Sequence, residues 1–315
     1  MRRMIAATSA AVLASTLTVA LPASASAGEA RPSTYVVSRE PGVLPEGIAV
    51  TDGGTMYVTS VGTGAVYRGH TRSAELAPFL PAGSDGRTAA AGIHVDGRGR
   101  LFVAGWDTGA LFVHDADGSL VARRVAPLAG AALNDLAITD DAVYVTDSAT
   151  GTLWRAAIDG PEIGELTPWL TPADFPGAPG FLNGIVATDG GRLALVADQG
   201  TELLYRVDLL RRTASVVEVT GGRMGADGLL LQGNRLYGVV NFPDGAGGTS
   251  FAVNLAVLSP DLTAAHVVCR SAPVPQDQFP TTIARDGDRL LWVNSQLGAA
   301  TPTPPFTVTQ VPDLR

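Results

Sequence analysis

The chain contains no lysine and only one cysteine in 315 residues. Its 22 basic residues are therefore all arginine, and 30 acidic residues outnumber them, for a net charge of −8. A negative protein is repelled by nucleic acid and by anionic lipid surfaces, which argues against either as a partner. One cysteine cannot build an internal disulfide framework. Stability must therefore come from a packed core, either alone or together with a bound metal.

Long apolar runs are also missing after the first residues, so no later segment is predicted to cross a membrane. The N-terminus has the form of a secretory signal peptide: Arg2 and Arg3, an apolar stretch over 4–21, and the small-residue site Ala25-Ser26-Ala27. A membrane anchor is the alternative. The Ala/Ser/Thr-rich stretch and its small-residue end favour cleavage after Ala27, which predicts a signal peptide over 1–27 and a secreted mature chain over 28–315.

Helical and catalytic signatures are absent as well. After residue 27 no segment shows a capped apolar repeat of 3.6 residues, so an all-β fold is expected. There is no G-x-S-x-G nucleophile elbow and no H-E-x-x-H zinc motif. These absences disfavour a serine hydrolase and a zinc peptidase of the common types.

What the sequence does contain is a sixfold repeat, in which an apolar run, a turn and a second apolar run recur. Four short strands per period of about 45 residues are typical of a β-propeller blade. The repeats align on these anchor residues: Gly47, Gly92, Asp135, Gly184, Gly228 and Thr282. The sixth repeat lacks a fourth strand, whereas the strand-like segment 33–38 precedes the first. We therefore predict one six-bladed β-propeller over 28–315, closed by this N-terminal strand.

In each predicted blade the first strand is innermost, so the residue before each anchor occupies an equivalent place around one axis. These six ring positions hold Glu46, Ala91, Asn134, Asn183, Asp227 and Thr281. Two carboxylates and two amides are hard oxygen donors, which suit Ca²⁺, or else Mg²⁺ or Mn²⁺. The absence of histidine and thiolate from the ring disfavours zinc. A divalent metal bound by Glu46, Asn134, Asn183 and Asp227 is therefore predicted.

A turn role is the alternative for these residues, because Asn-Gly and Asp-Gly are common turn dipeptides. The hairpin turns, however, lie further along each repeat, as at Asp52-Gly53 and Asp189-Gly190. The ring residues occupy a separate position, and this favours the metal interpretation.

The motifs PEG at 45–47, LND at 133–135, LNG at 182–184 and ADG at 226–228 resemble the senescence-marker-protein/gluconolactonase/luciferin-regenerating-enzyme family of six-bladed propellers. The resemblance covers about residues 40–300. It implies that the matching Glu, Asn, Asn and Asp bind a divalent metal in the channel. It also implies hydrolysis of lactones or related esters, with Asp227 as general base. One departure is Ala132, where gluconolactonase-like members carry an arginine, and this disfavours a polar sugar lactone.

Residues at the ends of the second strands are expected to reach the same face of the propeller and to contact substrate or orient the metal ligands. We assign this role to Asp147, Asp198, Asn241 and Asn294, and place His94 on the innermost strand of the second blade, facing the channel or the core. Long loops at 81–90, 171–181, 242–250 and 270–280 are expected on this face. Phe175, Phe181 and Phe279 in them either wall an apolar pocket or pin the loops.

Two functions follow from these predictions. The first is a secreted metal-dependent hydrolase that acts on a small-molecule lactone or ester. The second is a non-catalytic binding module in which calcium ties four blades together. A strictosidine-synthase-like propeller is a weaker third interpretation, because the sixth repeat offers no clear acidic base.

Overall fold

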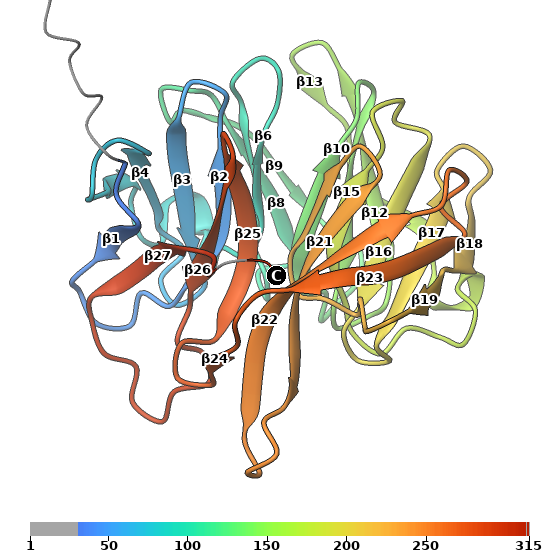
Figure 1. Cartoon of the computed structure of the whole chain (residues 1–315). Coiled ribbons are helices and arrows are strands. Elements are labelled where there is room, and N and C mark those ends of the chain that lie inside the picture. The colour runs from blue at the N-terminus through green and yellow to red at the C-terminus, as the bar shows by residue number, and fades with distance from the viewer. Residues whose placement is uncertain (1–30, 313, 315) are drawn as a thin grey trace, which may run out of the picture. The chain divides into compact units, whose positions relative to one another are not determined.

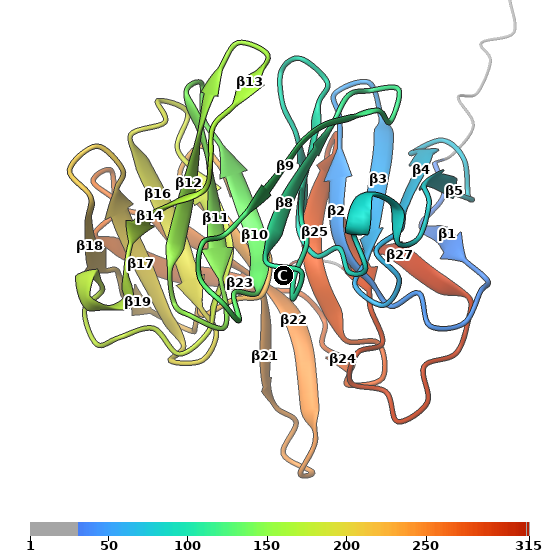
Figure 2. The same cartoon turned by 180° about the vertical axis from the view of Figure 1, so that it is seen from behind.

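The computed structural model describes residues 31–312 and 314, so the predicted signal peptide lies outside the described residues. The described chain is all-β, apart from two short 3₁₀ turns, and forms six antiparallel blades around an axis (Figure 1). The view from behind shows the same radial arrangement (Figure 2). This confirms the predicted six-bladed β-propeller. Within the described residues, no helix is long and apolar enough to span a membrane.

Each blade runs outward from its innermost strand. Blade 1 contains β2 (Pro45–Val50), β3 (Thr55–Ser60), β4 (Val66–His70) and β5 (Ala77–Leu80). Blade 2 contains β6 (Ile93–Val95), β7 (Leu101–Ala104), β8 (Ala110–His114) and β9 (Leu120–Val125). Blade 3 contains β10 (Leu133–Ile138), β11 (Ala142–Asp147), β12 (Leu153–Asp159), β13 (Glu162–Ile163) and β14 (Thr167–Leu170). Blade 4 contains β15 (Leu182–Ala187), β16 (Leu193–Asp198), β17 (Leu203–Asp208) and β18 (Thr213–Val216). Blade 5 contains β20 (Leu229–Gln232), β21 (Arg235–Pro243), β22 (Thr249–Leu258) and β23 (Ala264–Arg270), with β19 (Glu218–Thr220) and β24 (Val274–Pro275) paired to it. Blade 6 contains β25 (Pro280–Asp286), β26 (Arg289–Asn294), β27 (Phe306–Gln310) and β1 (Thr34–Ser38).

The core is divided among the interfaces between neighbouring blades. The described residues form six hydrophobic clusters, and each combines side chains of two consecutive blades, including the pair formed by blades 6 and 1. Trp154 of blade 3, for example, is buried with Phe102 of blade 2. Alternating strand residues therefore bury both faces of every blade, and the stability of each blade depends on both neighbours.

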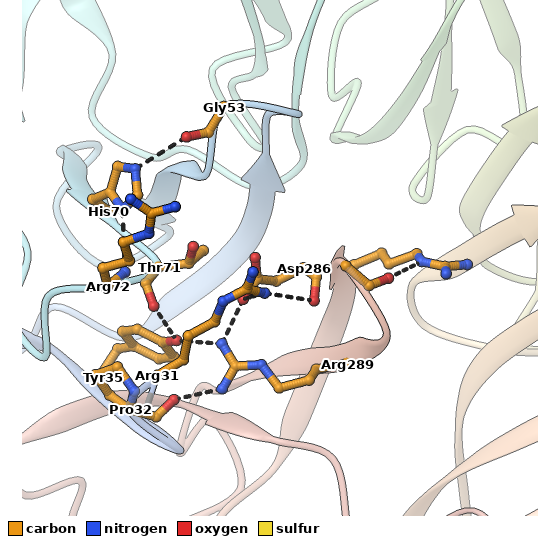
Figure 3. A network of polar contacts seen from close by, with 11 residues as sticks. Arg31, Pro32, Tyr35, Gly53, His70, Thr71, Arg72, Asp286 and Arg289 are labelled. Atoms are coloured by element: carbon orange, nitrogen blue, oxygen red, sulfur yellow. Dashed lines mark hydrogen bonds and ion pairs between the residues drawn. The ribbon is translucent and has the colours of Figure 1, made fainter. Parts of the chain in front are cut away.

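The ring is closed as predicted, because β1 pairs with β27 and completes blade 6. A polar network fixes this seam (Figure 3). Arg289 donates 2.8 Å hydrogen bonds to the Pro32 carbonyl and to the Tyr35 hydroxyl, and it also pairs with Asp286. The Tyr35 hydroxyl donates in turn to the Thr71 carbonyl of blade 1 at 2.8 Å. The N-terminal strand is thus bonded to both blades at the seam.

Two segments differ from the sequence prediction. The apolar run 214–219, where one fourth strand would complete the repeat, is divided: β18 stays in blade 4, while β19 pairs in parallel with β23 of blade 5. The expected loop at 242–250 is largely strand, because β21 and β22 continue as one long hairpin beyond the other blades (Figure 1). The first difference links two blades at their outer edges, and the second leaves only a short turn at 244–248.

A buried arginine–histidine contact joins blades 1 and 2. The side chains of Arg87 and His114 are both fully buried, and Arg87 Nη1 lies 3.1 Å from His114 Nε2. A guanidinium can only donate, so His114 Nε2 must be the unprotonated acceptor while its Nδ1 faces the Gly118 carbonyl at 3.2 Å. Burial, together with the charge of Arg87, lowers the pKa of His114.

We expect this contact to make the protein acid-sensitive. Below about pH 6.5 the unfolded chain takes up a proton that the folded His114 resists, so stability is lost as pH falls, with a slope of at most about 1.4 kcal/mol per pH unit. In urea unfolding, the stability of wild type relative to that of His114→Gln should fall between pH 7 and pH 5. The exposed His266→Gln serves as control and should follow the wild-type profile. Equal acid sensitivity of all three proteins would contradict the prediction.

Candidate metal centre

The inner strands are irregular where most of the ring residues lie. In blades 1, 3, 4 and 6 the pairing register between the first and second strand shifts at the ring residue, as between Pro45 and Ile48. A β-bulge of this kind re-aims one side chain out of the sheet. All four predicted ligands are buried: Glu46, Asn134, Asn183 and Asp227 expose 3–7% of their surface.

Backbone contacts between blades hold the ring positions together. The carbonyl of Glu46 accepts from the Thr281 hydroxyl at 2.7 Å, and that of Asn134 accepts from the Gly92 amide at 2.7 Å. Similar bonds reach the carbonyls of Ala91, Asn183 and Thr281. Five of the six blade junctions are therefore bonded at the ring itself, which fixes the ring residues relative to one another.

The glycine that follows most ring residues is explained by the same close approach. A Cβ on Gly47 would lie 2.5 Å from the Ala91 carbonyl oxygen, and a Cβ on Gly184 would lie 2.2 Å from that of Asp227. Both contacts are shorter than any real Cβ makes. The Gly of PEG and of LNG therefore reflects the close packing of neighbouring blades.

The two ring carboxylates are electrostatically unusual. Burial, then the charges of Asp227 and Asp135, raise the pKa of Glu46 well above its ordinary range. Burial likewise raises the pKa of Asp227 to about 8, an effect that the Asn183 amide partly offsets and the charge of Asp135 increases. Glu46 Oε2 is buried without a hydrogen-bond partner. Among residues 31–312, neither carboxylate forms an ion pair with arginine or histidine.

Asp135 is a site residue that the repeat alignment treated only as an anchor. It is 5% exposed, and its carboxylate accepts hydrogen bonds from the Leu136 amide at 2.8 Å and from the blade 4 Ile185 amide at 3.3 Å. The sequence did mark Asp135 as unusual, because an aspartate stands there at an anchor position where most repeats have glycine. Its negative charge acts on both ring carboxylates, so three buried acids share this part of the channel.

His94 faces the channel, as one of the two sequence interpretations had it. Its Nε2 lies 3.7 Å from Asp135 Oδ1, and it lines an axial cavity of about 970 Å³. Ile48, Ile185 and Ile283 also line this cavity, which continues to the hairpins joining the first and second strands. His94 is therefore on the hairpin side of the ring, away from the long loops.

Asp147 and Asp198 do not take the substrate-contacting role that the sequence suggested. Each carboxylate is fully buried and accepts five hydrogen bonds. The donors lie in the turn that follows it and in the segment before its own inner strand, and Asp147 also accepts from the Trp154 indole of β12. With their oxygens used in this way, the two carboxylates organise loops.

The residues that contact the ring lie one position later, because neighbouring residues of a strand point to opposite sides. The Ser148 hydroxyl accepts from Asn134 Nδ2 at 2.9 Å, and Gln199 Oε1 accepts from Asn183 Nδ2 at 3.1 Å. Gln199 Nε2 continues to Asn241 Oδ1 at 3.5 Å, so Asn241 does join the ring environment. Because the amide nitrogens of Asn134 and Asn183 donate these hydrogen bonds, the amide oxygens of the two residues are left to bind a cation.

Asn294, the last residue assigned to the substrate side, points into its own blade. Its amide nitrogen donates to the hydroxyls of Thr307 and Thr309 at 3.1 and 3.0 Å. Phe175 is buried against Tyr205, with ring centroids 5.1 Å apart, and so pins its loop. The ring of Phe279 packs against that of Phe251, with the ring centroids 4.6 Å apart.

The donor set that remains consists of two carboxylates and two amides. In the part of the chain that the structure describes, no three His, Cys, Asp or Glu side chains are grouped as metal ligands. An ion at the ring would therefore rely on the amide oxygens for half of its protein ligands. Buried, uncompensated carboxylates beside oriented amide oxygens fit a hard divalent cation.

No protein-family model matches the chain, and no curated protein matches it in sequence. Solved structures do resemble it. Regucalcin from Agrobacterium tumefaciens, described as a calcium-binding protein, is 19% identical with a TM-score of 0.57, and the match covers 90% of this chain and 98% of that one. Virginiamycin B lyase from Staphylococcus aureus is 11% identical with a TM-score of 0.54, covering 89% and 98%. The Malassezia sympodialis allergen Mala s 1 is 13% identical with a TM-score of 0.58, covering 90% and 96%. At these identities the likeness shows the propeller fold alone.

Proposed function

We propose that this protein is a divalent-metal-dependent hydrolase that acts on lactones or related esters, with calcium as the preferred ion. The observation that carries the proposal is the pair of buried carboxylates, Glu46 and Asp227, whose pKa values are raised and which have no cationic partner in the described chain. A bound cation would relieve this unfavourable charge. The calcium-binding description of the structurally similar regucalcin supports the same ion.

Each of the four ring residues has a place in this function. Glu46, Asn134 and Asn183 would hold the ion together with Asp227. When bound, a divalent cation at this site supplies polarisation of the substrate carbonyl and a more acidic water. Serine nucleophile motifs are absent from the sequence, which makes water the nucleophile that best fits this site.

Asp227 is the proposed general base. Its carboxylate takes a proton from the attacking water while the water oxygen bonds to the carbonyl carbon. The acyl carbon–oxygen bond then breaks, and the proton passes from Asp227 to the departing alkoxide, so no net proton is gained or lost by the protein. The hydrogen bond of Asn183 to Gln199 and that of Asn134 to Ser148 keep the amides in place during this exchange.

A binding module with structural calcium is the second candidate. It is favoured by the interblade bonds at the ring positions, since an ion there would tie four blades together. The two candidates differ in one respect: only the hydrolase needs a metal coordination position that a substrate carbonyl can reach.

The test is hydrolysis by the purified mature protein, measured with a panel of lactones and aryl esters before and after chelation. We expect about one divalent ion per chain and a hydrolytic rate that is lost with chelator and restored by Ca²⁺. Asn183→Ala should weaken both ion binding and hydrolysis, whereas Asp140→Ala, an exposed turn residue, should change neither. Stoichiometric ion binding without hydrolysis would favour the binding module, and absence of bound ion would overturn both.

A further inference from the structure

Trp106 departs from the pattern that four of the other five blades follow after the second strand. In blades 1, 3, 4 and 6 the equivalent residue donates its amide to the carbonyl two positions before its own ring residue, as Gln199 does to Phe181 at 3.0 Å. Trp106 instead exchanges hydrogen bonds of 2.9 and 3.1 Å with Leu133 of blade 3. Its φ of 49° is rare for a bulky residue and costs conformational energy. The chain thus adopts an unfavourable conformation that carries this residue onto the next blade.

The indole of Trp106 meets Phe181, which belongs to blade 4. The ring centroids are 6.2 Å apart with an interplanar angle of 51°. Phe181 lies directly before β15 and two positions before Asn183. The backbone bond to Leu133, directly before Asn134, gives the same location. The aromatic pair therefore lies beside the Asn134 and Asn183 sector of the ring.

The position of Phe181 is also fixed. Its amide donates to Asp198 Oδ1 at 2.8 Å, and its carbonyl accepts from Gln199. Both aromatic residues nevertheless remain partly exposed. A rigid, partly exposed pair of aromatic rings next to a polar centre is a surface suited to an apolar group of a ligand.

Polarity around the ring is unevenly distributed. In blades 3 to 6 the ring residue and the residue equivalent to Trp106 are both polar, as with Asn183 and Gln199. In blade 2 both are apolar, namely Ala91 and Trp106. Ala132, two positions before Asn134, is 8% exposed and offers no charge or hydroxyl for a sugar.

We propose that Trp106 and Phe181 form the specificity wall of this site, and that they select a lactone or ester carrying an alkyl or aryl substituent over a polyhydroxylated one. This inference rests on the proposed hydrolase function. The carbonyl would face the polar sector of blades 3 to 6, and the substituent would lie on the aromatic pair. A polyhydroxylated ring would leave its hydroxyl groups unpaired there, which is unfavourable.

The experiment compares two six-membered lactones, a 5-alkyl δ-lactone and glucono-δ-lactone, with calcium-saturated protein. We expect kcat/KM to be at least tenfold higher for the alkyl lactone. Trp106→Ala should lower kcat/KM for the alkyl lactone tenfold or more and leave that for glucono-δ-lactone within about twofold. Trp106→Phe should retain most of the preference, and Trp169→Ala, a partly buried tryptophan on the outer strand β14, should retain all of it.

A binding measurement separates this inference from the proposed function. The probe is an alkyl-substituted cyclohexanone, which keeps the ring and carbonyl of the alkyl lactone but cannot be hydrolysed. Calorimetric titration with it should show binding to wild type and Trp106→Phe but not to Trp106→Ala. That result without any hydrolysis would uphold the aromatic wall and refute the hydrolase. Two results would overturn the wall. One is an equal loss of kcat/KM for both lactones in Trp106→Ala. The other is a preference for the alkyl lactone that is unchanged in both Trp106→Ala and Phe181→Leu. Should Trp106→Ala not fold, Trp106→Leu and Phe181→Leu provide the same comparison.

Discussion

Replacing Asp227 by asparagine is expected to make the metal-free protein more stable and to remove its stabilisation by calcium. The substitution keeps the size of the side chain and removes a charge that burial opposes. Near pH 8 we expect the free energy of unfolding to rise by an amount on the order of 3–5 kcal/mol. The pKa of Asp227 is raised from its ordinary value of 3.8 to about 8, and each pKa unit corresponds to ~1.4 kcal/mol. The repulsion between Asp227 and Glu46 makes the expected gain smaller than the full product.

The pH dependence of this gain has a definite sign. The pKa of Asp227 is raised when the protein folds, so the folded state holds a proton that the unfolded chain releases above about pH 4. Metal-free wild type should therefore lose stability as pH rises from about 4 to about 8. Asp227→Asn should lose much less over this range, since only Glu46 still contributes.

Calcium should reduce the difference in stability between the two proteins. An ion that binds only the folded state stabilises it by about 2.7 kcal/mol at a hundred times its Kd. We expect this gain in wild type and little or none in Asp227→Asn. Urea unfolding at pH 5 and pH 8, with chelator or with Ca²⁺, measures all four conditions, and the exposed Asp140→Asn controls for net charge. A metal-free Asp227→Asn protein less stable than wild type at pH 8 would contradict the prediction.

The sequence predicted the fold well because the propeller repeats a local pattern. Period-two alternation, turn dipeptides and a fixed anchor recur in every blade, so an error in one repeat is corrected by the others. The ring position was accessible for the same reason: Glu46, Asn134, Asn183 and Asp227 differ in type but share a place. The N-terminal closing strand followed from counting strands in the sixth repeat.

The surroundings of the ring were less accessible, because they depend on a register of one residue. Asp147 and Asp198 are conspicuous acids, yet they face inward to their loops, and the less conspicuous Ser148 and Gln199 face the ring. Repeat spacing does not decide between adjacent positions at the end of a strand. The contact of Trp106 with blade 3 was not predictable either, since it follows from a positive φ that no sequence pattern indicated.

Adding one methyl group at Gly184 is expected to be the most damaging small substitution in the ring. In Gly184→Ala the new Cβ would lie 2.2 Å from the Asp227 carbonyl oxygen and 2.9 Å from the Leu229 amide nitrogen. Both are backbone atoms of blade 5, so no side-chain rotation relieves the overlap and blades 4 and 5 must separate. Overpacking of this kind costs about 3 kcal/mol or more.

Because the displaced carbonyl belongs to Asp227 itself, the same methyl group should disturb the metal centre, with calcium affinity reduced at least tenfold. Gly190→Ala is the matched control: it makes the same chemical change on the hairpin turn of the same blade, where a Cβ has no heavy atom within 4 Å. We expect it to stay within about 0.5 kcal/mol of wild type and to bind calcium normally. Thermal unfolding and calcium titration of the two variants give the comparison. Near-equal stabilities would mean that the blades do not approach at the ring as closely as the structure shows, and the ring glycines would then need another explanation.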